Sequence, residues 1–269
     1  MDTNQEPRRA LKRTDSRIAV GLLLIVVGAV LGIPSYMMGI VPMLALGLAS
    51  SLIGIMVLYL PGSASVSTSV LTDSALPSLL NIEKLLQDLD LDERGIYIPV
   101  AGPGIAPRVF VPLALTPSTK RPPLGLAHSR RIFVTVGKNP EDRGILLDAP
   151  GSGILSDLER SLHLDFARVP LSDLGSELDS GFRALGIAKL TSLVHQDASV
   201  RIEMELTKLF DLEAKLMSLT PRLSEHVGTP IVSTLAAATS KATAKYVKIG
   251  SAVFDLPRKK VNVTLQILA

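Results

Sequence analysis

The residues from Ile18 to Leu60 form an unbroken run of 43 without a single Asp, Glu, Lys, Arg or His. About 20 predominantly apolar residues are enough for one helix to cross the hydrocarbon core of a bilayer. The run is therefore long enough for two crossings. It predicts that this part of the chain is a membrane-spanning segment rather than part of a soluble domain.

The run divides at the stretch GIPSYMMGIVP, where Pro34 and Pro42 each deny a helix one amide donor. We expect one helix over about 18–35 and a second over about 39–60. A connection this short makes them an antiparallel hairpin, and small residues on both helices would let the backbones come close together. Because the first span is near the minimum length, the alternative is a hairpin that crosses only part of the bilayer.

Residues 1–17 form a basic tail that carries five Lys and Arg. Basic flanks stay on the cytoplasmic side of a membrane. We therefore expect a multi-pass protein of the cell membrane, with the N-terminus and the C-terminal domain in the cytoplasm. A cleaved secretory signal is the competing interpretation. It is disfavoured because no small-residue cleavage site closes the first apolar run, and a second, longer run follows at once.

The composition excludes several classes of chemistry and partner. The chain has no cysteine, which excludes disulfides, thiol nucleophiles and Cys-ligated metal sites. Beyond the hairpin, 23 basic and 22 acidic residues nearly balance, whereas a nucleic-acid-binding domain is usually strongly basic. We therefore expect no nucleic-acid partner. A local basic excess between Lys120 and Arg143 is interpreted as a solvated surface, with docking to anionic lipid or to a partner as the alternative.

A Ser/Thr-rich stretch, residues 61–75, follows the hairpin and is predicted to be a flexible linker. Residues 76–269 are expected to form a soluble α+β domain attached to the transmembrane hairpin, either as one body or as two subdomains that meet near residue 170. Short runs of branched residues bounded by Gly or Pro predict four strands, in the segments GIYIPV, RVFVPL, RIFVTV and GILLDAP. Helical spacing of apolar residues predicts helices over 76–91, 152–162 and about 171–193.

The last third of the chain has the clearest patterns. In ASVRIEMELTKL, apolar and polar residues alternate strictly, which predicts a half-exposed strand. The segment LFDLEAKLMSLTPRL is helical in pattern up to Pro221. A further helix is expected to begin with Thr229 as its N-cap and Pro230 at its first position. Two closing strands are predicted in KYVKIGSAVFDL and KKVNVTLQIL, with DLPRKK as the loop between them.

Several of these segments together resemble a group of uncharacterised archaeal membrane proteins. They are the apolar hairpin, the Ser-rich linker, GIYIP followed by FVPL, APGSGILSDLE, and the closing unit PRLSEHVGTPIVSTLAAATSKATAKYVKI. The resemblance covers most of the chain and implies no activity. The closing helix and two strands are also similar to the end of the vinyl reductase domain, a small-molecule-binding module. That module's pattern carries cysteines which this chain lacks, so the similarity implies only that the last third could enclose a ligand.

Familiar catalytic and metal-binding motifs fail on inspection. VTVGKNP has the Gly137–Lys138 pair of a phosphate-binding loop but lacks its first glycine and its hydroxyl. DLDLDERGIYIP begins like a calcium loop but has Glu93 where glycine is needed. The four histidines are scattered along the sequence, and Glu203 and Glu205 are interpreted as a solvated strand face. We therefore expect no catalytic residue, no metal site and no cofactor.

The stretch ILLDAPGSGILSDLE combines an apolar strand, a glycine-rich turn and the start of a helix. Its residues Gly151, Ser152 and Gly153 are the candidate anion site, because backbone amides at a helix start can face an anion. The favoured interpretation is a structural corner, in which the glycines permit the bend and Ser152 caps the helix.

Two functions from different classes remain. The first, which we favour, is a non-enzymatic, membrane-anchored cytoplasmic domain that binds a partner protein, a lipid head group or a small ligand. The second is a membrane-tethered, hydrolase-like enzyme whose catalytic residues no motif marks. The expected partners are the lipid bilayer and either another protein or a second copy of the chain.

Overall fold

The computed structural model describes residues 6–59, 68–91, 93–100, 102, 105–113, 122–136, 142–207 and 209–268. Two compact units divide the chain, Met1–Ser67 and Thr68–Ala269. The second unit contains the predicted soluble domain, residues 76–269.

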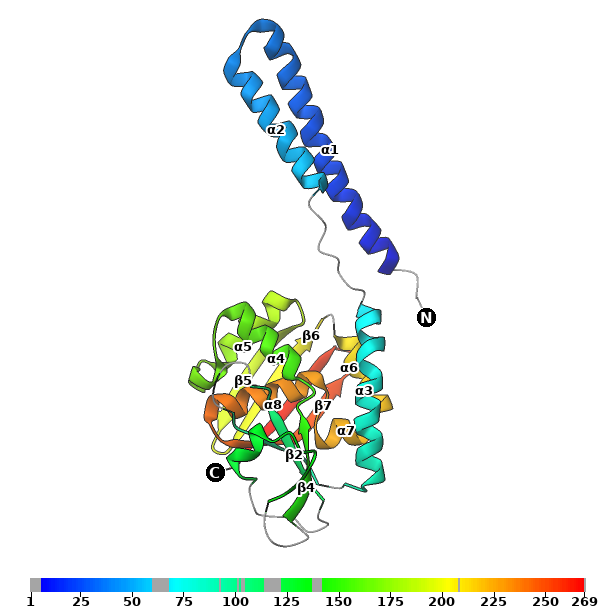
Figure 1. The fold of residues 1–269 in the computed structure, drawn as a ribbon, viewed down its shortest axis with the longest axis vertical. Coiled ribbons are helices and arrows are strands. Elements are labelled where there is room, and N and C mark those ends of the chain that lie inside the picture. The colour runs from blue at the N-terminus through cyan, green and yellow to red at the C-terminus, as the bar shows by residue number, and fades with distance from the viewer. Residues whose placement is uncertain are drawn as a thin grey trace. The chain divides into compact units, whose positions relative to one another are not determined.

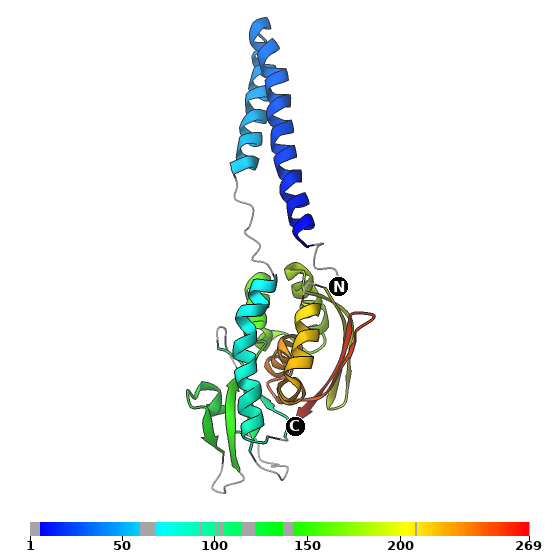
Figure 2. The ribbon, with the colours of Figure 1, turned by 90° about the vertical axis from the view of Figure 1, so that its right-hand side faces the viewer.

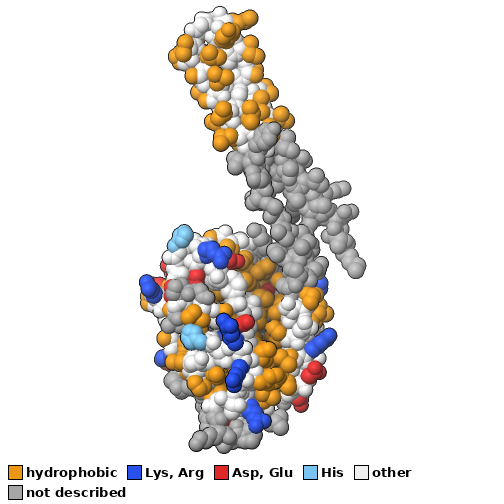
Figure 3. All heavy atoms as spheres, in the orientation of Figure 1, with side chains coloured by type: hydrophobic (Ala, Val, Ile, Leu, Met, Phe, Trp, Pro, Cys, Tyr) orange, Lys and Arg blue, Asp and Glu red, His pale blue; other side chains and the backbone are white. Residues whose placement is uncertain are grey.

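The first unit is a helical hairpin made of α1 (Glu6–Met38) and α2 (Val41–Tyr59), drawn in blue in Figure 1. Its segments Ala19–Met38 and Val41–Leu58 are long and apolar enough to cross a membrane, judged by length and composition alone. Only 17% and 11% of these segments, respectively, are buried. Where Figure 3 colours the hairpin by side-chain type, it shows hydrophobic side chains over much of the surface.

Helix α1 runs through Pro34 instead of ending there, which corrects the predicted boundary near residue 35. A proline removes one amide donor and need not stop a helix that continues on both sides. The helix ends at Gly39, which has a φ of 68°, a conformation that glycine adopts without strain. It also begins at Glu6, inside the predicted basic tail.

The two helices of the hairpin touch at glycines. A Cβ atom added to Gly28 would lie 2.2 Å from Oγ of Ser51 and 2.6 Å from the carbonyl oxygen of Gly47. One added to Gly54 would lie 2.8 Å from the carbonyl oxygen of Gly21. The close approach predicted from the small residues is therefore present, and larger side chains at these positions would force the backbones apart.

The second unit is a mixed α/β domain on an antiparallel sheet, with its eight strands in the order β3-β4-β2-β1-β7-β8-β6-β5. Its elements follow one another as α3 (Thr68–Asp88), β1 (Ile96–Ile98), β2 (Arg108–Pro112), the 3-10 helix η1 (Leu124–His128), β3 (Phe133–Thr135), β4 (Arg143–Asp148), α4 (Ser152–Leu162), the 3-10 helix η3 (Phe166–Arg168), α5 (Leu174–Leu185), β5 (Ala188–Gln196), β6 (Ser199–Leu206), α6 (Phe210–Leu219), α7 (Pro221–His226), α8 (Pro230–Thr243), β7 (Tyr246–Asp255) and β8 (Lys260–Leu268).

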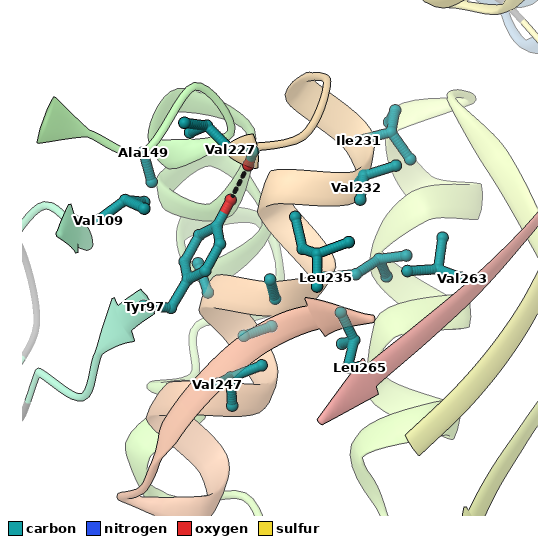
Figure 4. Packing of buried hydrophobic residues seen from close by; sticks show 14 of the residues in the cluster. Tyr97, Val109, Ala149, Val227, Ile231, Val232, Leu235, Val247, Val263 and Leu265 are labelled. Carbon is teal, nitrogen blue, oxygen red and sulfur yellow. Dashed lines mark hydrogen bonds between the residues drawn. The ribbon is translucent and has the colours of Figure 1, made fainter. Parts of the chain in front are cut away.

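The α-helices gather on one face of this sheet, as Figures 1 and 2 show. The main core lies between them and the sheet, and α8 is its centre because every residue from Pro230 to Lys241 is buried. In Figure 4, Ile231, Val232 and Leu235 of α8 lie over the inward side chains of the sheet, and Tyr97 donates a hydrogen bond of 2.5 Å to the carbonyl oxygen of Val227. A smaller cluster packs η1 against the other face of β1, β2 and β4.

Several predicted elements match the structure, and three differ from it. Strand β6 alternates as predicted, with buried Val200, Ile202, Met204 and Leu206, and α4 covers residues 152–162 as expected. Helix α3 begins at Thr68, inside the predicted linker 61–75; the other residues of that linker, 61–67, lie outside the described residues. The predicted helix over 171–193 ends at Gly186 and is followed by β5, and α7 was not predicted.

Candidate functional site

The candidate anion residues Gly151, Ser152 and Gly153 lie at the start of α4, where this helix meets the first turn of α8. The amide of Gly151 donates to Oγ of Ser233 at 3.1 Å, and the hydroxyl of Thr234 donates to the carbonyl oxygen of Gly151 at 3.1 Å. A Cβ atom on Gly151 would lie 2.3 Å from the amide nitrogen of Thr234. The favoured interpretation, a structural corner, agrees with these contacts.

Ser152 does not cap α4, which corrects one detail of that interpretation. The N-cap position belongs to Gly151, and no side-chain hydrogen bond caps the helix. Gly153 is exposed and has open space around its Cα. None of the three residues lines the pocket described next.

A pocket of about 360 Å³ lies elsewhere in the second unit, among α6, α7, the start of α8 and strand β7. Its size falls within the range typical of sites for small molecules, about 300–1,000 Å³. Its walls combine apolar and polar side chains, as such sites usually do. The lining residues are Arg94, Met217, Pro221, Ser224, Glu225, Thr229, Val232, Ile249, Ser251, Ala252 and Phe254.

Arg94 reaches this pocket because β1, which follows it in the chain, pairs with β7. Strand β7 has a β-bulge there: Ile249 faces Leu265 and Ser251 faces Thr264, which leaves Gly250 without a partner in β8. The guanidinium Nη1 of Arg94 donates to the carbonyl oxygens of Ile249, at 3.1 Å, and Gly250. Bulges are common beside functional sites, where they change the direction in which a strand presents its groups. The carbonyl oxygens of this bulge hold the guanidinium of Arg94 at the pocket wall.

Two residues with hydroxyl groups line the pocket, Thr229 and Ser224. Thr229 is only 2% exposed, and its hydroxyl is hydrogen-bonded to the carboxyl group of Glu213. The Oγ of Ser224 has no partner among the described residues. Both hydroxyl oxygens are buried, so neither is exposed to the cavity.

Glu213, on α6, lies behind Thr229 and is fully buried. Its Oε1 accepts a hydrogen bond of 3.0 Å from the amide of Ile231 in the first turn of α8, and its carboxyl group is also hydrogen-bonded to the Thr229 hydroxyl. Burial raises the pKa of Glu213 to about 7, and the nearby Thr229 hydroxyl and the Ile231 amide only partly oppose this rise. The carboxyl group therefore changes charge near neutral pH.

Sequence reasoning did not identify this pocket. Thr229 was predicted as an N-cap, which is its position in the structure, but Arg94, Ser224 and Glu213 were not singled out. One signal was available, since Glu213 follows Leu209 by four residues and precedes Leu216 by three. An acid on the apolar stripe of a helix is seldom buried without a specific partner.

The remaining titratable groups have structural surroundings. The buried Nζ of Lys241 contacts Glu159 at 2.5 Å and Asp165 at 3.0 Å, and so ties α8 to α4 and η3. Glu203 accepts from Lys260 at 2.7 Å, which agrees with an ion-paired strand face rather than a pair of catalytic carboxylates. The histidines lie on four separate segments, and among the described residues no group of three or more metal-binding side chains is found.

Comparison with known proteins gives a family and no activity. A family model described as "Domain of unknown function (DUF7982)" matches residues 2–266. A search of curated proteins and a search of solved structures found no significant match. The family match includes both the hairpin and the domain that carries the pocket. Because it spans nearly the whole chain, the protein belongs to the DUF7982 family.

Proposed function

We propose that this protein is a membrane-anchored, non-enzymatic domain that binds a small ligand in the pocket among α6, α7, α8 and β7. The carrying observation is the pocket itself, a cavity of about 360 Å³ whose wall combines apolar side chains with the fixed guanidinium of Arg94. A mostly apolar wall with a few placed polar groups is typical of small-molecule sites. A partner protein or a lipid head group remains the broader form of the proposal.

Binding is favoured over catalysis because the hydroxyl oxygens of Ser224 and Thr229 are buried, whereas a nucleophile must reach its substrate. One observation favours the alternative of a membrane-tethered hydrolase, because the pKa of Glu213, about 7, suits a general acid or base. Glu213 itself is not among the lining residues.

The proposal places the hairpin in the cell membrane, with the N-terminus and the C-terminal domain in the cytoplasm. Support comes from the apolar, largely exposed surfaces of α1 and α2 and from the five basic residues before the first span. The proposal also includes an archaeal origin and a similarity of the last third to the vinyl reductase domain, both of which rest on the sequence resemblance. It further includes self-association, which rests on the small residues in the hairpin.

A topology experiment tests the anchoring. The full chain should stay in the membrane pellet after alkaline carbonate extraction, and a reporter that is active only in the cytoplasm should work when fused after Ala269. Release into the supernatant would contradict anchoring. Activity of only an external reporter would contradict the orientation.

A binding experiment tests the pocket. The full chain in zwitterionic nanodiscs is titrated with 6-(trifluoromethyl)naphthalene-2-carboxamide, an uncharged probe, and the ¹⁹F signal is compared with that over empty nanodiscs. We expect a Kd on the order of 1 mM, and its loss in Ala252→Leu, which fills the pocket. Ala167→Leu, a partly buried alanine on η3, is the matched control. Equal binding by the two variants would refute the pocket as the site for this probe.

A further inference from the structure

We infer that one edge of the sheet docks on the anionic surface of the lipid bilayer. This surface, called here the β3 edge, consists of Arg130, Arg131, Ile132, Phe133 and Arg143. The inference rests on the proposed membrane anchoring and adds a second contact with lipid, made by the domain itself. It follows from the uncovered apolar side chains of this edge, from the arginines beside them and from the apolar hairpin that the same chain carries.

The helices do not cover β3, the edge strand beside β4. Phe133 pairs with Ile145 of β4, so the two side chains lie on the same face of the sheet. Ile145 is fully buried in the main core, whereas Phe133 is 60% exposed. The neighbouring Ile132 is 53% exposed. The sheet therefore extends past its helices, and two adjacent apolar side chains face water at its edge, which Figure 2 shows in green at the margin of the domain.

This apolar pair differs from the other exposed apolar side chains of the second unit. Single exposed apolar residues are common on soluble proteins and need no explanation. Among the described residues, however, Ile132 and Phe133 are the only two that are adjacent in sequence, and Phe133 is the only aromatic one. The exposed large apolar side chains described in this unit are Leu124, Ile132, Phe133, Val194, Leu219, Val253 and Leu256.

The arginines of the β3 edge have no acidic partner among the described residues. Arg130, Arg131 and Arg143 are exposed, and none of them forms a salt bridge there. Two acids lie in the described part of this lobe, residues 122–136 and 142–148, and both are engaged. Asp142 is buried and has a partner, and Asp148 pairs with an arginine of β2 at 2.8 Å. Positive charge without a counterion therefore surrounds the apolar pair.

An anionic lipid surface fits this combination better than a protein partner does. The cytoplasmic leaflet carries anionic lipids, which attract basic side chains close to the membrane. Side chains such as Phe and Ile enter the boundary between head groups and acyl chains when basic residues lie beside them. The proposed anchor keeps this lipid surface within reach of the domain, so weak contact is sufficient. A protein partner would need an acidic and apolar surface of its own.

The test measures whether lipid touches the β3 edge in the full chain. The chain has no cysteine, so Thr135→Cys, at an exposed position of β3, provides one site for an NBD label. Nanodiscs that hold one copy contain phosphatidylcholine alone or with about 30% phosphatidylserine, and doxyl lipids in both quench a label that touches the bilayer. We expect quenching to be at least about threefold stronger with phosphatidylserine, and the difference to be lost in about 1 M NaCl.

Thr191→Cys is the matched label, because Thr191 is also an exposed threonine on an edge strand. Its strand, β5, is the opposite edge of the eight-stranded sheet, roughly 30 Å from β3 at the usual strand spacing. We expect its label to be quenched weakly, and equally in both kinds of nanodisc. Size-exclusion chromatography of each sample shows whether the chain stays with the nanodisc.

Substitutions separate the role of charge from that of the apolar side chain. Replacing the three arginines of the β3 edge by glutamine should remove the effect of phosphatidylserine. Phe133→Ser should weaken quenching about twofold or more, whereas Val253→Ser, on β7 with the same exposure of 60%, should not. Circular dichroism checks that every variant is folded. The control for charge is a set of three exposed arginines elsewhere, which should keep the effect: Arg160→Gln, Arg201→Gln and Arg258→Gln.

The outcomes separate this inference from the proposed anchoring. Equal quenching of the labels at Thr135 and Thr191, or an effect of phosphatidylserine that survives without the three arginines, would overturn the docking surface and leave the anchor intact. Shielding of the Thr135 label from aqueous iodide only in nanodiscs with two copies, without quenching by lipid, would show that a second copy covers the edge and would also overturn it. A chain that elutes only with anionic nanodiscs would refute the anchor, and arginine-dependent quenching there would keep the docking surface.

Discussion

Glu213 and Thr229 are buried polar residues beside the first turn of α8, and their side chains are hydrogen-bonded to each other. Thr234, in the next turn of α8, is equally buried, and its hydroxyl lies between the carbonyl oxygens of Gly151 and Pro230. Conservative substitutions at these three residues measure what each buried polar contact contributes to stability.

Glu213→Gln should stabilise the protein at neutral and alkaline pH. Folding raises the pKa of Glu213 from 4.5 to about 7, so between these values the folded protein binds more protons than the unfolded chain. The free energy of unfolding contributed by this group therefore falls as the pH rises from about 4.5 to about 7, by up to about 3 kcal/mol. Glutamine keeps the acceptor for Ile231 and has no such loss.

Thermal unfolding of the full chain at pH 5 and pH 8, followed by circular dichroism, checks this expectation. The gain in Tm from Glu213→Gln should be small at pH 5 and large at pH 8. Glu203→Gln is the control on the sheet surface, where the loss of the Lys260 ion pair should change stability by less than about 1 kcal/mol. A gain that is equal at both pH values would contradict the burial argument.

Thr229→Val should destabilise the domain, because it removes the buried hydroxyl that is hydrogen-bonded to the Glu213 carboxyl group. We expect a cost of about 1–2 kcal/mol. Thr234→Val removes the one hydroxyl proton shared between the carbonyl oxygens of Gly151 and Pro230, and should cost about 1–2 kcal/mol. Thermal unfolding of both variants gives the comparison.

At the scale of elements, the junction between α4 and α8 depends on one glycine. The main-chain atoms of Pro230 and Thr234 occupy the space that a side chain on Gly151 would need, at 2.4 and 2.3 Å. Gly151→Ala should therefore destabilise the domain by about 2–3 kcal/mol. Gly153→Ala, two residues later in α4 and in open space, should stabilise it by about 0.5–1 kcal/mol.

Chemical or thermal unfolding of these two variants tests the structural corner. An equal response would mean that α8 does not pack against the start of α4 as described. If inorganic phosphate raised the Tm of the unmodified protein through this loop, the candidate anion site would regain support and the corner would not be its whole role.

Elements with a strong local pattern could be predicted from the sequence. Strand β6 alternates strictly, and α8 begins with Thr-Pro, so both were placed correctly. The segment after α5 was predicted to be helical as far as about residue 193. The αL conformation of Gly186 ends the helix there, and the pairing of β5 with β6 then fixes an extended backbone.

The candidate pocket depends on long-range pairing, which no local pattern shows. Arg94 and Gly250 are 156 residues apart in sequence, and they meet because β1 lies beside β7. The acid on the apolar stripe of α6 was visible in the sequence, but its partner, the amide of Ile231, was not. For the same reason the glycine-rich corner looked like a binding loop until its packing against α8 was known.

At the scale of the whole molecule, the two units have different kinds of surface. The hairpin exposes apolar side chains along most of its described length, whereas the main core of the domain uses residues from Leu79 to Ile267 and none from the hairpin. A unit of about 200 residues with its own core is of the size that folds independently. Anchoring and folding should therefore be separable.

A chain of residues 68–269 should be soluble without detergent and should unfold in one cooperative transition. Size-exclusion chromatography and thermal unfolding followed by circular dichroism provide the measurements. The full chain should require detergent or nanodiscs under the same conditions. Aggregation of the 68–269 chain, or a gradual melt, would show that the domain needs the hairpin to fold.

The bulge in β7 adds one residue, Gly250, to that strand. On one side of Gly250 the side chains of Val247 and Ile249 face the core, and on the other side those of Ala252 and Phe254 do. Without Gly250 these four residues would alternate regularly along the strand, so the sheet could be formed by a β7 that is one residue shorter. Pairing with β8 does not require the extra residue, because Gly250 has no partner in that strand. What the insertion provides is a pair of carbonyl oxygens turned toward Arg94, and a deletion of Gly250 should leave a folded sheet that has lost its hold on the guanidinium.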